Sequence, residues 1–284
     1  EIDNSLKKIY TILHSDGNEE TIPFLNVDAI DYCTFGNSKP FRIKIRNILN
    51  DNFTYFYVKK ADASRVYGLE LEHILSPYTI NYLVYKDTLI EEHISGIPGD
   101  DFIKNILPNC SSTEKSQIAK EFVKFKERCL IRLLGDMRSY NYVITPIHDF
   151  DQIIYKIRAI DFDQQSFEGS LKVYNLQFMK ENFNMVEMVG RKLQNSSIEQ
   201  YKIEERSFIA KRMITLPNRT ERLINCMKKD NISFHKNVEQ LKKDLIAYVG
   251  DVAFKKCENM GEILETILAF VKRNYLDISN KELF

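Results

Sequence analysis

The sequence of 284 residues carries no excess of charge of either sign, because 40 Lys and Arg residues balance 40 Asp and Glu residues. A protein whose main partner is nucleic acid needs a basic excess or a basic stripe to neutralise phosphates. Adjacent lysines such as Lys228 and Lys229 are spread along stretches of helical pattern, where solvated faces are the more common outcome. We therefore expect no nucleic acid among the partners.

Long apolar runs and linker-forming residues are also missing. No run approaches the roughly 18 apolar residues that span a membrane, so we expect no membrane partner. The chain starts without a basic and then apolar leader, and no signal peptide is expected. With only 10 Gly and 7 Pro residues and no internal repeat, long flexible linkers are not expected either.

Cysteine and histidine lack the spacings of metal sites. The five cysteines include no C-x-x-C pair, and an odd number of such cysteines indicates free thiols in a reducing compartment, so a cytoplasmic location is expected. None of the five histidines is spaced with another His or with Cys as a metal pair, which argues against zinc. A Gly-x-Ser-x-Gly sequence is absent too, so a serine-hydrolase nucleophile is not supported.

The pattern of residues 30–94 is typical of short strands. Residues 41–45 alternate apolar and basic side chains, and residues 53–58 are aromatic and β-branched, with a polar turn at 50–52 between them. A short helix is expected from Leu69 to Leu75, and a further strand at 88–94. These signals predict a small antiparallel sheet.

The pattern changes after the Gly/Pro turn at residues 95–99. Ser111 and the acid at Glu114 indicate a helix start. A hairpin is expected next, with its first strand starting at Asn141 and its second strand ending at Ile160. From Leu176 onward the apolar residues recur with the period of a helix. The sequence thus predicts an α+β fold with two lobes. Residues 1–94 are the β-rich, nucleotide-binding lobe in this prediction, and residues 95–284 are the helical lobe with the catalytic hairpin.

One group of residues fits the chemistry of phosphoryl transfer. That reaction needs a lysine on the phosphates, an acid to hold the lysine, oxygen ligands for Mg²⁺ and a carboxylate near the attacking hydroxyl. The strand at residues 55–58 ends in Lys59 and Lys60, and the helix that follows carries Glu70 and Glu72. Lysines at strand ends and acids on helices are more often ordinary surface residues. The sequence alone does not decide which of the two lysines and which of the two acids would take these roles.

The strand at residues 88–94 runs into a glycine- and proline-containing turn. An edge strand that enters a turn leaves backbone N–H and C=O groups unpaired, and adenine can take up such groups. A plain strand followed by a loop that starts a helix explains the same residues equally well.

The loop before the hairpin is the most specific signal. Gly135, Asp136 and Asn141 form a Gly-Asp-x-x-x-x-Asn sequence, and Asp161 follows the second strand of the hairpin. Three oxygen-bearing side chains are thus expected at one end of one hairpin, where Mg²⁺ binds readily when phosphate oxygens complete its coordination. A polar loop with surface acids is the alternative, but a structural hairpin rarely needs this combination.

In these motifs the sequence resembles the protein-kinase-like superfamily, over about residues 30–168. It is nearer to the aminoglycoside-phosphotransferase, choline-kinase and HipA-type members than to eukaryotic protein kinases. The resemblance implies ATP and Mg²⁺ as cofactors, with Lys59 on the α- and β-phosphates and Glu70 as its ion-pair partner. It implies that the hinge that meets adenine is formed by Glu91, Glu92 and His93.

The same resemblance makes Asp136 the catalytic carboxylate, places Arg138 near the γ-phosphate, and makes Asn141 and Asp161 the ligands of Mg²⁺. The chain departs from the family pattern in its phosphate loop, where a single glycine is present; a loop of this kind still lets backbone N–H groups approach phosphate. The loop residues are Gly36, Asn37 and Ser38. Leu134 replaces a histidine of the family, and Asp163 replaces a glycine and is a second candidate ligand.

We therefore expect an ATP- and Mg²⁺-dependent phosphotransferase that acts on a hydroxyl of a protein or of a small molecule. A pseudokinase, which keeps the fold and does no chemistry, is the main alternative, and nucleotidyl transfer is a third. Because no long activation segment is readable, the acceptor is expected against the helical region after Leu176. The mixed charges of that region make a polycationic acceptor a poor fit.

Overall fold

The computed structural model describes residues 1–34, 38–150 and 152–276. The chain divides into two compact units. The first, here called the sheet unit, comprises residues 1–62 and 79–94, and the second, the helical unit, comprises residues 63–78 and 95–284. A small antiparallel sheet in one unit and a helical second unit with a hairpin confirm the predicted α+β class.

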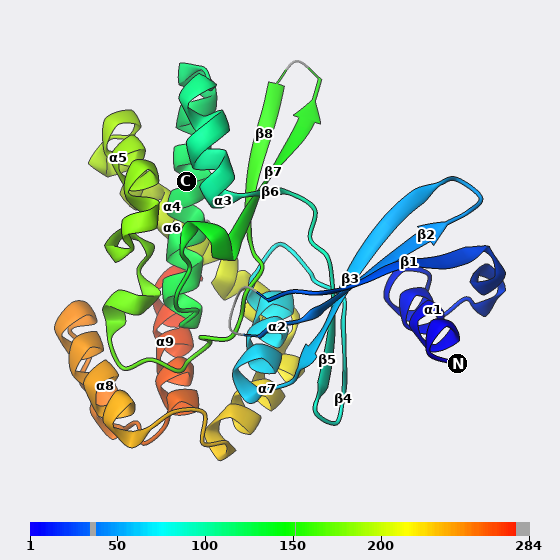
Figure 1. The fold of residues 1–284 in the computed structure, drawn as a ribbon. Helices are drawn as coiled ribbons and strands as arrows, with labels where there is room; N and C mark the ends of the chain where they lie inside the picture. The colour runs from blue at the N-terminus through cyan, green and yellow to red at the C-terminus, as the bar shows by residue number, and fades with distance from the viewer. Residues whose placement is uncertain (35–37, 151, 277–284) are drawn as a thin grey trace. The chain divides into compact units, whose positions relative to one another are not determined.

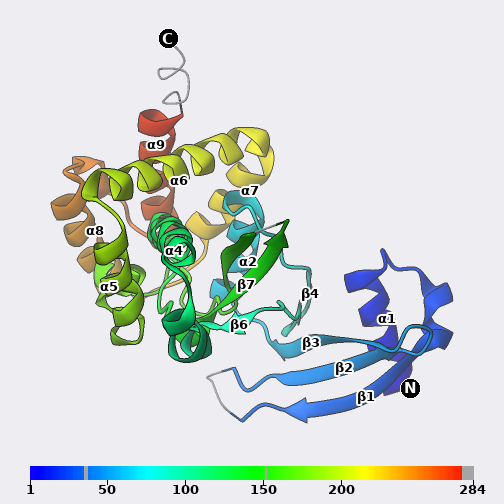
Figure 2. The ribbon, with the colours of Figure 1, turned by 90° about the horizontal axis from the view of Figure 1, so that it is seen from above.

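The sheet unit is a five-stranded antiparallel sheet in the order β1-β2-β3-β5-β4. The strands are β1 (Leu25–Tyr32), β2 (Phe41–Asn47), β3 (Asn52–Lys60), β4 (Tyr82–Tyr85) and β5 (Thr88–Glu92). Helix α1 (Ile2–His14) lies beside the sheet (Figure 2), and its Leu6 and Leu13 share a core with Ile43, Ile45 and Phe56. A short 3-10 helix, η1 (Glu19–Phe24), connects α1 to β1.

The alternation in β2 explains how this sheet forms. Ile43 and Ile45 are 2% and 1% exposed, whereas the basic side chains that alternate with them lie on the other face. There Arg42 pairs with Asp31 at 2.8 Å across the β1–β2 ladder. The predicted strands at 41–45 and 53–58 are therefore confirmed, because period-two alternation places one set of side chains in the core.

The helical unit contains eight α-helices within the described residues, together with a three-stranded sheet in the order β6-β7-β8. The helices are α2 (Ala63–Leu75), α3 (Gly99–Asp101), α4 (Ser112–Arg132), α5 (Phe183–Lys192), α6 (Asn195–Thr215), α7 (Pro217–Lys229), α8 (His235–Val249) and α9 (Met260–Tyr275), and the strands are β6 (Ile97–Pro98), β7 (Tyr142–Asp149) and β8 (Gln152–Ala159). Helices α4, α6 and α9 pack against one another (Figure 1). The helix start at Ser111 is confirmed, because its side chain and that of Glu114 form a capping box.

Helix α2 belongs to the helical unit, although the sequence boundary placed it in the N-terminal lobe. Its Leu71, Ile74 and Leu75 are buried in the core that α4, α6, α7 and α9 form. Its Glu72 is 3% exposed and pairs with Arg132 of α4. Apolar burial and a buried ion pair thus tie α2 to the helices. The division of functions between residues 1–94 and 95–284 stays a prediction.

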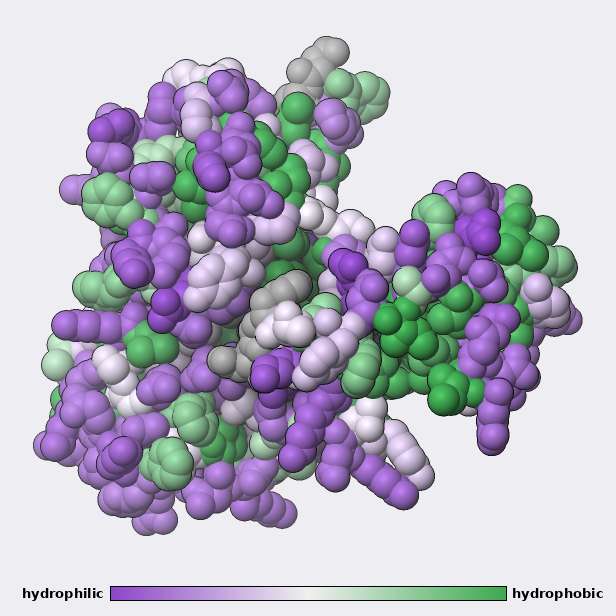
Figure 3. All heavy atoms as spheres, viewed as in Figure 1, coloured by the Kyte–Doolittle hydropathy of each residue, from purple (hydrophilic) through white to green (hydrophobic). Residues whose placement is uncertain are grey.

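The surfaces of the two units differ in character. Figure 3 shows that polar side chains dominate the visible face of the helical unit, whereas apolar side chains gather on the sheet unit. Exposed apolar side chains of the sheet unit include Ile2, Ile30, Leu49 and Phe53. Among the described residues, no helix has the length and apolar character that crossing a membrane requires.

Candidate functional site

The loop between α4 and β7 holds the predicted catalytic residues. Helix α4 ends where Leu133 takes a left-handed conformation with a φ of 57°. Leu133 and Leu134 are fully buried, so they fix the start of the loop in the core. The next residue, Gly135, donates its N–H to the carbonyl of Gln164 at 3.1 Å. A Cβ atom at Gly135 would lie 3.1 Å from Val173 and 3.2 Å from that carbonyl, so glycine suits this close approach.

Asp136 is also left-handed, with a φ of 54°, a conformation that Asp tolerates better than most residues. Its backbone carbonyl accepts hydrogen bonds from the N–H of Arg138 at 2.8 Å and from Nδ2 of Asn141 at 2.7 Å. Its carboxylate is 33% exposed and lines a hollow of about 450 Å³ in the helical unit. The loop thus presents a fixed carboxylate to solvent.

Arg138 joins two carboxylates at the edge of this hollow. Its Nε donates to Asp136 at 2.7 Å, and its guanidinium pairs with Glu181 at 3.1 Å. The hydrogen bond to Asp136 raises the pKa of the Arg138 guanidinium above its ordinary value, and this keeps the side chain cationic. No sequence motif pointed to Glu181, because it lies 43 residues after Arg138 in the chain.

Asn141 and Asp161 lie at the same end of the predicted hairpin. Strands β7 and β8 pair Tyr142 with Ala159, and the carbonyl of Asn141 accepts the N–H of Ile160 at 3.0 Å. Asp161 comes directly after this pair, and its Oδ1 accepts the N–H of Asp163 at 3.4 Å. The predicted hairpin is confirmed, and it places both side chains close to the loop of Asp136. The roles of the two residues as Mg²⁺ ligands stay predictions.

The oxygen atoms of these two residues suit Mg²⁺. Asn141 uses its Nδ2 to hold the Asp136 carbonyl, so its Oδ1 is the atom left to face a cation. Asp161 is partly exposed. Within residues 1–34, 38–150 and 152–276, no three His, Cys, Asp or Glu side chains form a group that could hold a metal by themselves. One carboxylate with phosphate oxygens is the usual way in which proteins bind Mg²⁺, so the residues fit this ion.

Helix α2 holds the Asp-Phe-Asp segment at residues 161–163. Phe162 is 1% exposed and packs so closely against Gly68 of α2 that a Cβ atom there would lie 2.8 Å from the Phe162 Cβ. Arg65 of the same helix pairs with Asp163 at 3.6 Å. The second candidate ligand, Asp163, is therefore engaged by an arginine, which leaves Asp161 as the better oxygen donor for a metal ion.

Lys59 is held in the sheet unit by a buried acid. Its Nζ lies 2.7 Å from Oε2 of Glu91, and the two side chains are 7% and 6% exposed. The pairing of Tyr57 with Glu91 in the β3–β5 ladder puts Glu91 diagonally across from Lys59 on one face of the sheet. The sequence assigned Glu91 to the hinge and did not foresee this partnership.

The predicted partner of Lys59 has another partner in the structure. Glu70 pairs with Arg219 of α7 at 2.8 Å, and Glu72 pairs with Arg132, all within the helical unit. The Lys59–Glu70 pair implied by the resemblance stays a prediction.

The predicted hinge residues lie in β5, which holds Glu91 and Glu92, and directly after it at His93. The N–H of Glu92 donates to the carbonyl of Asn81 at 2.9 Å, and the N–H of His93 donates to Tyr55 at 3.0 Å. The expectation that this strand leaves its N–H groups unpaired is wrong at these two positions, because β5 is flanked by β3 and β4. Burial lowers the pKa of His93, and the nearby Arg42 acts in the same direction. Adenine binding by Glu91, Glu92 and His93 stays a prediction.

The predicted phosphate loop is described only in part. Gly36 and Asn37 lie outside the described residues. Ser38 lies in the bend that precedes β2 and is partly buried. Its role in phosphate binding stays a prediction.

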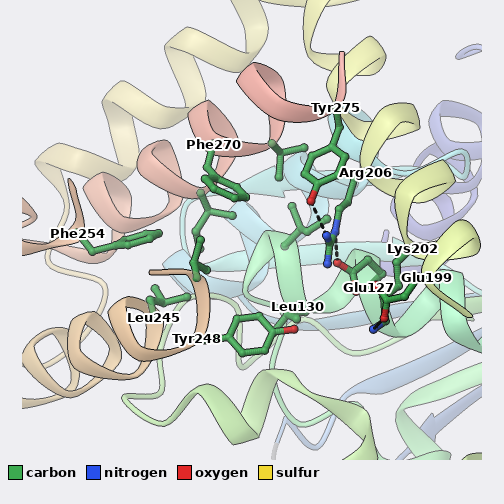
Figure 4. Close-up of a pocket in the computed structure, with 14 residues that line it drawn as sticks. Glu127, Leu130, Glu199, Lys202, Arg206, Leu245, Tyr248, Phe254, Phe270 and Tyr275 are labelled. Carbon is green, nitrogen blue, oxygen red and sulfur yellow. Dashed lines mark hydrogen bonds and ion pairs between the residues drawn. The ribbon is translucent and has the colours of Figure 1, made fainter. Parts of the chain in front are cut away.

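A second hollow, of about 400 Å³, lies among α4, α6, α8 and α9 (Figure 4). Its apolar wall includes Leu245, Phe254 and Phe270. At the other side, Arg206 donates to Glu127 and to the hydroxyl of Tyr275, both at 2.6 Å. None of the predicted site residues that the structure describes lines this hollow.

Comparisons with known proteins find matches among solved structures alone. No protein-family model matches the sequence, and no curated protein matches it. Among solved structures, the chain is similar to an ethanolamine kinase of Plasmodium vivax, with 12% sequence identity and a TM-score of 0.35. The match covers 93% of this chain and 88% of the other. At that identity and TM-score the resemblance assigns no activity.

Proposed function

We propose that the chain is an ATP- and Mg²⁺-dependent phosphotransferase that acts on a hydroxyl acceptor, either a protein or a small molecule. The observation that carries this proposal is the fixed Asp136 loop. Asp136 lines a hollow, and the side chain of Asn141 is hydrogen-bonded to the Asp136 carbonyl. Asp161 follows the β7–β8 hairpin, at the end where Asn141 precedes it. This group contains the carboxylate and the oxygen ligands that phosphoryl transfer requires.

In the proposed reaction, Asp136 orients the acceptor hydroxyl and accepts its proton. The acceptor oxygen forms a bond to the γ-phosphorus of ATP, the bond from that phosphorus to the oxygen of the β-phosphate breaks, and ADP leaves. The proton then passes from Asp136 to solvent. Arg138, which donates to Asp136 at 2.7 Å, holds the carboxylate in place and adds positive charge beside the transferred group.

The remaining roles concern the nucleotide. Asn141 and Asp161 would hold Mg²⁺, which when bound offsets the negative charge of the phosphates. Lys59 would bind the α- and β-phosphates, and its buried bond to Glu91 keeps its ammonium in one place. The proposal keeps Glu70, the hinge at residues 91–93 and the loop at 36–38 as nucleotide contacts to be tested.

A pseudokinase is the second candidate. The burial of Lys59 favours it, because a side chain that is 7% exposed has little surface open to a phosphate. The single glycine of the phosphate loop and Leu134 in place of histidine point the same way.

Thermal unfolding with and without Mg²⁺-ATP, together with turnover of labelled ATP, tests the proposal. A ligand that binds only the folded state raises its stability, so an enzyme shows both a higher Tm and turnover. Asp161→Ala should abolish turnover, whereas Asp149→Ala, at the other end of the hairpin, should not. A raised Tm without turnover indicates the pseudokinase. If Mg²⁺-ATP neither raises the Tm nor is turned over, the proposed nucleotide chemistry is refuted. The intact mass of a labelled protein product separates phosphoryl from nucleotidyl transfer.

A further inference from the structure

The hollow beside Asp136 has a second wall that no predicted motif includes. One wall is the loop with Asp136 and Arg138. The other consists of three short 3-10 helices, which are η5 (Leu171–Tyr174), η6 (Leu176–Phe178) and η7 (Lys180–Asn182). These short helices contribute Lys172, Phe178, Lys180 and Glu181 to the lining.

Buried hydrogen bonds hold the two walls together. Asn182 is fully buried, and its Nδ2 donates to the carbonyls of Met137 at 2.9 Å and Leu176 at 3.2 Å. Its Oδ1 accepts from the hydroxyl of Tyr142 at 3.0 Å. The N–H of Asp136 donates to the carbonyl of Val173 at 3.2 Å. The hollow is therefore preformed, because its walls do not depend on a ligand for their position.

The charges around this hollow favour an anion. Its ionisable lining residues are three cations and two acids. Arg138 forms ion pairs with both acids, Asp136 and Glu181. Lys172 and Lys180 are exposed, and neither forms an ion pair with an acid in the described part of the chain. The Lys172 ammonium lies 5.8 Å from the ring of Phe178, which is 56% exposed.

We propose that the acceptor is a hydroxyl compound that carries carboxylate or phosphate groups, which bind Lys172 and Lys180 while its hydroxyl lies at Asp136. A cationic acceptor would meet two lysines of like charge, and a neutral one would leave both without a partner. This inference rests on the proposed function for the transfer step, but the binding of the anion does not require ATP.

Three peptides with a neutral fluorophore test the site. Each has one serine with three residues on either side, which are all Glu, all Gln or all Lys. Fluorescence anisotropy measures their binding to the full chain, to K172E/K180E and to K229E/K255E. The last variant changes the net charge equally, at two exposed lysines that do not line the hollow. Glycerate, glycerol and ethanolamine serve as competing small molecules and as acceptors of labelled phosphate from ATP.

We expect the Glu peptide or glycerate to bind at least about tenfold more tightly than its neutral and cationic counterparts. K172E/K180E should lose this preference, and K229E/K255E should keep it. Preference for the peptide indicates a protein acceptor, and preference for glycerate indicates a small acid. Equal loss in both variants, tighter binding of a neutral or cationic probe, or no binding of either acidic probe overturns the inference. Selective binding without labelled transfer keeps the anion site and contradicts the proposed function.

Discussion

The two units hold their predicted site residues in opposite ways. In the helical unit, the Asp136 and Arg138 side chains are 33% and 40% exposed, and backbone hydrogen bonds fix the loop that carries them. In the sheet unit, Lys59 and Glu91 are 7% and 6% exposed and hold each other. An exposed pair contributes little to stability and stays open to a substrate, whereas breaking a buried pair is costly. The same substitution therefore has different consequences in the two units.

Asp136→Asn should produce the largest effect. The amide keeps the size of the side chain and tolerates the left-handed backbone, but it cannot accept the acceptor's proton. We expect transfer of labelled phosphate to fall by about 10²- to 10⁴-fold, with nearly unchanged urea unfolding. A large loss of stability would show that this exposed pair is structural, like the pair in the sheet unit.

Lys59→Met should instead act mainly on stability. It removes the cation that lies 2.7 Å from the buried Glu91 carboxylate, so the free energy of unfolding should fall by about 3–5 kcal/mol. Lys59→Met/Glu91→Leu should recover most of this loss without restoring nucleotide binding. Lys60→Met is the matched control, because Lys60 is exposed at the end of the same strand. Urea unfolding measures the stability of each variant, and thermal shifts with Mg²⁺-ATP measure its nucleotide binding. A Lys59→Met protein as stable as the unchanged chain would show that the buried pair does not differ from the exposed one in its contribution to stability.

Asn182→Ala should have a smaller effect, shared between stability and activity. It leaves the buried hydroxyl of Tyr142 without its acceptor, which costs about 1–3 kcal/mol. Adding Tyr142→Phe should return part of that free energy. We expect the KM for the acceptor to rise more than kcat falls, because the wall of the hollow loosens. Asn184→Ala, at a nearby exposed position, should change neither quantity.

The smallest effect concerns pH and the sheet unit. Burial lowers the pKa of His93 below its ordinary value of 6.5, so the folded state binds this proton less readily than the unfolded state does. His93 therefore costs no stability above pH 6.5, and stability falls as the pH drops below that value. We expect less than about 1 kcal/mol between pH 7.5 and 5.5. His93→Gln should reduce this dependence in urea titrations, and an unchanged dependence would assign it to other groups such as His14.

Local patterns predicted much of both units. Alternation gave the strands at residues 41–45 and 53–58, and the hairpin brought Asn141 and Asp161 to one end because antiparallel pairing is set by the residues of the hairpin itself. The partner of Lys59 depends instead on the register of β3 against β5, which are separated by α2 and β4. No periodic signal marks such a register.

The second wall of the hollow was missed for a related reason. Glu181 and Asn182 lie in a 3-10 helix of three residues, which is too short to show a period. Glu70 and Glu72 look alike in the sequence, yet one is at the surface with Arg219 and the other is buried with Arg132. Only tertiary packing separates the two.

The membership of α2 in the helical unit determines how the chain can be divided. A fragment that starts at residue 95 lacks α2, so the core surface that Leu71, Ile74 and Leu75 cover would be open to water. Such a fragment has an exposed apolar groove and would self-associate. A fragment meant to keep this core therefore needs residues 63–78 as well as the contiguous C-terminal segment, supplied as a joined or added helix.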